Sequence, residues 1–175
     1  KFSSSTKLVV NKLKELDSYK NAFVSKDDIK KNDYASSLLV IVDTHKKSYL
    51  AYPDLLESIE KKVVIDHHRR GPEFIDDALL TYHEIYASSS SELVTEILMY
   101  LDNIELSSVE AEAIYSGIVV DTKNFTFKTG VRTFEVASYL KKIGADTVET
   151  KMLFKSNVED FIARADIIKN TKKEA

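Results

Sequence analysis

Two short apolar runs stand out along the 175-residue chain, at 38–42 and 63–65. Both are rich in β-branched residues, and each is followed directly by an aspartate. Such apolar runs are typical of strands buried on both faces. The dipeptide Tyr52-Pro53 interrupts the segment between them, and 54–60 has the composition of a short helix. Two strands joined by a helical crossover form a βαβ unit with parallel strands. The pattern therefore predicts a parallel sheet.

Helical spacing of apolar residues dominates the rest of the chain. Helices are predicted around 8–16, 93–101, 111–114 and 133–143, with two more capped at Asp146 and Asn157. Ser89 and Ser107 each precede a Glu by three residues, the spacing of a capping box. A further strand is predicted at 79–86, and an apolar run follows the third of these helices at 117–120. The expected fold is α/β, an open and mostly parallel sheet flanked by helices, with a helical C-terminal part.

Composition narrows the classes of function. The formal net charge is −3, so a general binder of duplex nucleic acid is not expected. The chain contains no cysteine, which excludes disulfides, thiolate metal sites and a cysteine nucleophile. No apolar run approaches the about 20 residues of a transmembrane helix, so this segment is not expected to span a membrane.

Candidate chemistry lies where the apolar runs stop. Three runs end in an acid, at Asp43, Asp66 and Asp121, and His67 and His68 follow the second of them. Parallel strands end at the same edge of a sheet, so we expect these side chains to meet there. A single Asp after a strand is as often a turn cap as a ligand, but three such ends beside a histidine pair favour a site. Carboxylates and imidazoles suit Mn²⁺, Mg²⁺, Fe²⁺ or Zn²⁺.

Motifs in a fixed order carry a family resemblance. Val-Asp-Thr-His at 42–45, Ile-Asp-His-His-Arg-Arg-Gly at 65–71, Tyr-Ala-Ser-Ser at 86–89 and Gly-Ile-Val-Val-Asp-Thr-Lys at 117–123 resemble the DHH superfamily of metal-dependent phosphoesterases. Within it, they are similar to the catalytic region of the membrane-anchored bacterial cyclic di-AMP phosphodiesterases. The resemblance implies a Rossmann-like domain over 1–168 and the start of a linker to a C-terminal domain at 169–175.

The resemblance also implies roles for individual residues. Asp43 would bridge two metal ions, and His67 and Asp121 would ligate one of them. His68 and Arg69 would act on the substrate phosphate as catalytic groups. Asp66 would hydrogen-bond to an imidazole and orient it without touching the metal. Arg70, Ser88 and Ser89 would bind substrate, although a solvated loop for Arg70 and a helix cap for the serines are equally reasonable interpretations. His45 is interpreted as a loop histidine, with a supporting role behind the metal ligands as the alternative, and His83 as a structural residue of its strand.

The implied activity is hydrolysis of cyclic di-AMP to linear pApA, with two Mn²⁺ ions in the complete site and Mg²⁺ or another divalent metal as an alternative. A parent protein of this kind would be anchored in the bacterial membrane with this domain on the cytoplasmic face. Two alternatives stay open: an exonuclease or phosphatase of the same superfamily that acts on short oligonucleotides such as pApA, and a module that binds nucleotide without catalysis.

One expected motif is missing. Relatives carry His-x-x-x-Asp-x-Asp on a first strand and turn, and no such pattern occurs in 1–42. We therefore expect these residues alone to be inactive or nearly so. The sheet surface left exposed by a lost strand predicts self-association as a homodimer.

Overall fold

The computed structural model describes residues 3–29, 34–153, 162 and 165–169. Its sheet has three parallel strands in the order β1-β2-β3, with β1 at Leu38–Val42, β2 at Lys61–Asp66 and β3 at Leu80–His83. The register pairs Val40 with Val63, and Asp66 with His83. The predicted parallel sheet is confirmed, and β3 is shorter than the predicted strand at 79–86. β1 is an edge strand with Leu38 and Val40 half-exposed, and the homodimer stays a prediction.

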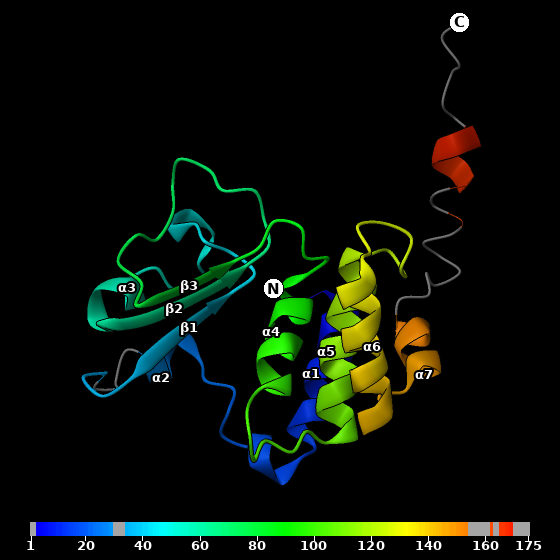
Figure 1. Ribbon diagram of the computed structural model, residues 1–175, viewed down its shortest axis with the longest axis horizontal. Coiled ribbons are helices and arrows are strands. Elements are labelled where there is room, and N and C mark those ends of the chain that lie inside the picture. The colour runs from blue at the N-terminus through cyan, green and yellow to red at the C-terminus, as the bar shows by residue number, and fades with distance from the viewer. Residues whose placement is uncertain (1–2, 30–33, 154–161, 163–164, 170–175) are drawn as a thin grey trace, which may run out of the picture.

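The helices lie mainly beyond the carboxyl ends of the strands, as the strand arrowheads in Figure 1 show. They are α1 (Ser4–Lys14), α2 (Lys26–Ile29), α3 (Leu55–Ser58), α4 (Ser90–Met99), α5 (Ser108–Asp121), α6 (Val131–Ile143) and α7 (Thr147–Leu153), with 3₁₀ turns at Asp17–Tyr19 and Lys47–Tyr49. Leu93 of α4 is buried with Ile65 of β2, which joins the helices to the sheet. The α/β class is confirmed, and the carboxyl edge of the sheet faces a helical wall.

Local sequence explains where several helices begin and end. The Ser89 hydroxyl accepts a hydrogen bond from the Glu92 N–H at 3.0 Å and caps α4. Ser107 and Glu110 form a complete capping box at the start of α5, so two backbone N–H groups are satisfied reciprocally. Gly144 ends α6 with φ of 125°, a conformation that favours glycine. The predicted cap at Asn157 and the residues 170–175 lie outside the described residues.

The apolar run at 117–120 does not end a strand, although the sequence pattern suggested that it would. It forms the last turn of α5 and not the end of a strand, so Asp121 reaches the sheet edge from a helix. A short buried helical turn and a short buried strand have the same apolar pattern, which is why the pattern misled. No helix among the described residues is both long enough and apolar enough to cross a membrane.

Gly117 lets α5 approach α4 closely. A Cβ at this position would lie 2.1 Å from the Ser91 Oγ and 3.1 Å from the Ser91 Cβ. Rotation of the Ser91 hydroxyl would relieve the shorter contact but not the one to its Cβ. The absence of a side chain at Gly117 therefore sets the distance between two helices that both border the carboxyl edge of the sheet.

A left-handed turn follows α5 directly. Lys123, Asn124 and Phe125 have φ of 47°, 58° and 61°, which is unfavourable for the two residues other than Asn. The buried Thr122 compensates: its hydroxyl donates to the Ile118 carbonyl at 2.6 Å and accepts from the Phe125 N–H at 2.9 Å. The turn therefore holds the end of α5, and with it Asp121, in one place.

We expect Gly117→Val to lower the free energy of unfolding by about 1–3 kcal/mol, because the new side chain forces α4 and α5 apart. The matched control is Gly130→Val, since a Cβ at Gly130 would meet nothing within 4 Å. Urea denaturation followed by circular dichroism measures both variants. Equal losses in the two variants would show that close approach at Gly117 does not limit helix packing.

Candidate metal centre

Three potential ligands converge where the strands meet the helical wall. Asp43 follows β1, His67 follows β2 and Asp121 ends α5. The His67 Nε2 lies 3.5 Å from the Asp43 Oδ1 and 3.7 Å from the Asp121 Oδ2. Asp43 adopts a left-handed backbone with φ of 69°, a conformation that Asp tolerates better than most residues. The three residues expected to hold metal are thus brought together, although the third arrives from a helix.

The imidazole of His67 has the tautomer that a metal ligand needs. Its Nδ1 donates to the Ala87 carbonyl oxygen at 3.3 Å, which leaves the lone pair on Nε2. That Nε2 is buried and has no hydrogen-bond partner within the part of the chain that the structure describes. A buried acceptor without a donor is costly, and a cation between Nε2 and the two carboxylates would satisfy it.

The charges around His67 lead to the same conclusion. The Asp43 carboxylate, 3.5 Å from the His67 Nε2, is the main cause that raises the pKa of His67, and the imidazole lowers the pKa of Asp43 in turn. Partial burial raises the pKa of Asp121, and the nearby Asp43 carboxylate adds to this effect. Two carboxylates that repel one another beside an imidazole lone pair suit a divalent cation, so these residues fit such an ion.

Asp66 organises the imidazoles behind this centre. It is fully buried, and its Oδ1 accepts from the backbone N–H of His67 at 2.9 Å and from the His68 Nδ1 at 2.8 Å, while its Oδ2 accepts from the His45 Nδ1. Burial alone would raise the pKa of Asp66, but the donors from His45 and His68 outweigh it and hold the pKa below its usual range. The geometry agrees with the supporting role expected for Asp66.

The other two histidines also make contacts in this region. His45 lies in a loop but is only 4% exposed, and its Nε2 accepts the Gly71 N–H at 3.3 Å. His83 donates from its Nε2 to the His68 carbonyl oxygen, so it ties β3 to the residue beside the centre. Nδ1 or Nε2 atoms of His45 and His83 and a carboxylate oxygen of Asp66 lie within 4.8 Å of one another.

His68 and Arg69 line an open pocket beside the centre. Asp66 fixes the His68 ring from its Nδ1 side, and the side chain is 55% exposed. Asp43 and Asp66 line the same pocket. The pocket therefore joins one of the metal-ligand candidates, Asp43, to the two residues expected to meet phosphate.

The residues expected to bind substrate are placed less favourably. Ser88 and Ser89 are fully buried, and the Ser88 hydroxyl donates to the Glu92 carboxylate at 2.6 Å while Ser89 caps α4. The geometry therefore favours the helix-cap interpretation for Ser89, and it gives Ser88 a buried hydrogen bond to Glu92. The Arg70 guanidinium lies 3.8 Å from the centre of the Phe74 ring and does not line the pocket that contains His68 and Arg69.

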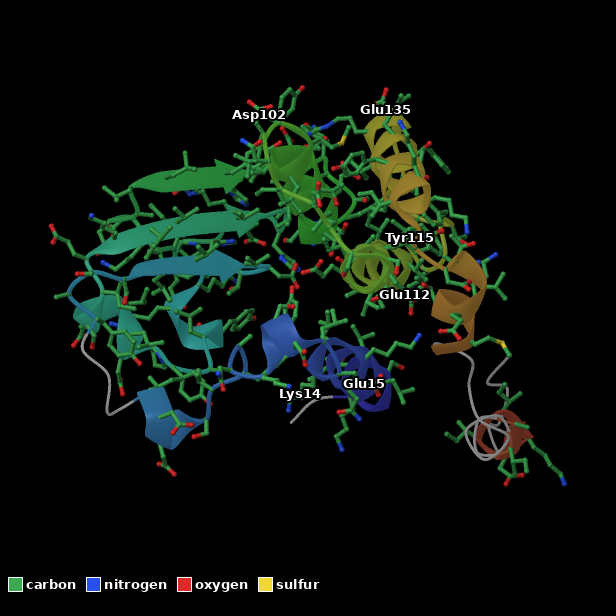
Figure 2. The ribbon with its side chains drawn as sticks, turned by 90° about the horizontal axis from the view of Figure 1, so that it is seen from below. Lys14, Glu15, Asp102, Glu112, Tyr115 and Glu135 are labelled. Atoms are coloured by element: carbon green, nitrogen blue, oxygen red, sulfur yellow. The ribbon has the colours of Figure 1, made fainter. Side chains whose placement is uncertain are left out.

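Sequence reasoning missed Ser90. Its hydroxyl donates to the Asp43 Oδ1 at 3.0 Å and so connects the start of α4 to the end of β1. The only signal in the sequence was its place in a run of four serines, which does not single it out. A second cavity of about 350 Å³ borders Asp43, Ser90 and Asp121, and α1 forms its far wall. Figure 2 shows α1 beside α5 from below.

The chain is similar to a known family and to several known proteins. Residues 3–118 match the family described as DHH family, N-terminal domain. The chain is 45% identical over 169 residues to the cyclic-di-AMP phosphodiesterase GdpP of Bacillus subtilis (strain 168). The aligned residues cover 96% of this chain and 26% of that protein. The chain is also 32% identical over 121 residues to the probable bifunctional oligoribonuclease and PAP phosphatase NrnA of Streptococcus mutans, covering 69% of this chain and 37% of that protein.

The fold has a counterpart among solved structures. The crystal structure of an exopolyphosphatase-related protein from Bacteroides fragilis superposes with a TM-score of 0.76 at 21% identity, covering 89% of this chain and 46% of that one. This likeness supports the α/β fold. The 175 residues span about a quarter of the length of GdpP. From the family match and the identity to these relatives, the chain belongs to the DHH family.

Proposed function

We propose that this chain forms the metal-binding part of a phosphodiesterase that hydrolyses cyclic di-AMP to linear pApA. The observation that carries the proposal is the convergence of Asp43, Asp121 and the buried His67 Nε2, which has no hydrogen-bond partner among the described residues, beside an open pocket. The substrate is proposed from the 45% identity to GdpP, which extends over nearly the whole chain. Mn²⁺ is the metal that we propose, because a mixed carboxylate and imidazole set suits it.

Each residue has a defined task in this proposal. His67, Asp43 and Asp121 would hold a divalent cation, and Ser90 would keep the Asp43 carboxylate in place. When bound, such a cation lowers the pKa of water and neutralises charge on a phosphoryl group. His68 presents its Nε2 to the pocket, because its Nδ1 is committed to Asp66. In its protonated form His68 would donate a hydrogen bond from Nε2 to a phosphoryl oxygen, and Arg69 would stabilise the negative charge that grows there.

The first test is metal binding. We expect Asp121→Ala to weaken Mn²⁺ binding at least about tenfold, since loss of an outer partner of a metal ligand alone costs 10- to 100-fold in many sites. Isothermal titration calorimetry on the 175-residue chain measures the affinity. Asp102→Ala is the matched control, because Asp102 is an exposed acid in the turn after α4.

An Asp121→Ala chain that binds Mn²⁺ as tightly as the wild type would show that Asp121 is not a ligand. Loss of binding in Asp102→Ala as well would show that the effect is not specific to the centre.

The second test concerns the reaction. The natural protein that carries these residues is incubated with Mn²⁺ and cyclic di-AMP, and separately with pApA, and the products are separated by chromatography. We expect cyclic di-AMP to disappear with formation of pApA, and His67→Ala to lower kcat/KM by at least about 100-fold, because several kcal/mol of charge stabilisation depend on the bound metal.

A second candidate is hydrolysis of short oligonucleotides, which the 32% identity to NrnA favours. Turnover of pApA without turnover of cyclic di-AMP would support this candidate and reject the first. A protein that binds nucleotide but turns over neither substrate would instead be a non-catalytic module. Retention of three converging ligands argues against this last function, because binding alone does not need them.

A further inference from the structure

The pocket beside His68 extends away from the metal centre into a second region. Its volume is about 460 Å³, within the range of about 300–1,000 Å³ typical of small-molecule sites. Asp43 and His68 line one part of it, and Lys46 and Tyr49 line another. Neither Lys46 nor Tyr49 has a task in the metal centre. The pocket is therefore larger than the reaction at one phosphate requires.

Tyr49 offers an aromatic surface in this region. Tyr49 is 71% exposed, so much of its ring is accessible to a ligand. The Lys46 Nζ lies 5.1 Å from the centre of the ring, so a cation is held next to the ring. A ring with a neighbouring ammonium group presents a stacking surface and an anion contact side by side.

The backbone that carries these residues is held in place from several sides. The backbone N–H and hydroxyl of Ser48 donate to the Glu73 carboxylate at 2.8 and 2.9 Å. The buried His45, one residue before Lys46, accepts from the Gly71 N–H through its ring and from the Ile75 N–H at 2.9 Å through its carbonyl oxygen. The loops after β1 and β2 are thus joined, and the wall of the pocket exists before any ligand binds.

Lys46 and Arg69 line this wall without a salt bridge among the described residues, although Glu73, whose pKa is lowered mainly by hydrogen bonds from Ser48, is close enough to Lys46 for the lysine charge to lower that pKa further. Across residues 3–29, 34–153, 162 and 165–169, no carboxylate lies within salt-bridge distance of Lys46 or Arg69. The nearby Glu73 is occupied by Ser48. Two unpaired cations on the wall of one pocket attract an anion, and a phosphate meets that requirement.

From this arrangement we infer that Lys46 and Tyr49 form a subsite for the part of a dinucleotide that lies beyond the scissile phosphate. One nucleobase stacks on the Tyr49 ring and the second phosphate contacts Lys46, while Arg69 keeps its task at the scissile phosphate. The inference rests on the proposed function and deepens it, because it explains how the site selects a dinucleotide over a single phosphoester. The scissile phosphate stays at His68 and the metal centre.

Binding of a non-hydrolysable phosphorothioate analogue of cyclic di-AMP tests the subsite. Equilibrium dialysis with Mn²⁺ on the natural protein gives the dissociation constant. We expect Tyr49→Ala to raise it roughly 5- to 100-fold, the range for loss of one base–aromatic stack. Tyr49→Phe keeps the ring and is expected to bind nearly as the wild type does. Lys46→Ala is expected to weaken binding, and more strongly at low salt.

Tyr100→Ala and Lys142→Ala serve as matched controls. Tyr100 is 88% exposed at the end of α4, Lys142 is exposed on α6, and neither lines this pocket. The expected result is weak binding in Tyr49→Ala and Lys46→Ala alone. Calorimetric titration of each variant with Mn²⁺ shows whether the metal centre is intact.

The outcomes separate the two hypotheses. If the wild type binds the analogue and hydrolyses cyclic di-AMP while Tyr49→Ala binds within twofold of it, the subsite is wrong and the proposed function stands. If Tyr49→Phe is as weak as Tyr49→Ala, stacking on the ring is wrong. A wild type that neither binds the analogue nor turns over cyclic di-AMP overturns the proposed function and the subsite with it.

Discussion

The arrangement of the centre depends on one buried carboxylate. Asp66 is fully buried at the end of β2, and it accepts hydrogen bonds from His45, from the His68 ring and from the backbone of His67 and His68. Its charge is satisfied by these donors and not by a Lys or Arg. Removal of any one donor would leave a buried charge less compensated, which is costly. The loops after β1 and β2 are therefore held in one relation, and both lead into the centre.

The helical side supplies a second constraint. Gly117 allows α5 to lie against Ser91 of α4, and the turn held by Thr122 stops α5 immediately after Asp121. α4 contributes its own contact, from Ser90 to Asp43. The sheet and the helical wall thus each present part of the centre, and neither part contains all three ligand candidates. Packing between these two layers converts separate motifs into one site.

Residues that are adjacent in the chain, or that follow neighbouring strands, could be placed from the sequence alone. Adjacent residues such as His67 and His68 needed no tertiary information, and Asp43 was placed beside them because parallel strands end at one edge. The sequence also predicts Asp121 at the same edge, although the apolar run before it is helical and not the end of a strand. A loop position was favoured for His45 over a supporting role, because its partner Asp66 lies 21 residues away and no local pattern indicates the contact.

By itself, then, the sequence determined the element types, the parallel pairing of 38–42 with 63–65 and the kinds of ligand available. Apolar periodicity and short capping motifs encode these features over a few residues. Only the tertiary structure decided that Ser88 and Ser89 are interior, that Ser90 contacts Asp43, and that Lys46 and Tyr49 share a pocket with His68. These contacts depend on how helices dock on the sheet and how two loops are pinned together. Such distances are set by packing between segments far apart in the chain, and no local pattern records them.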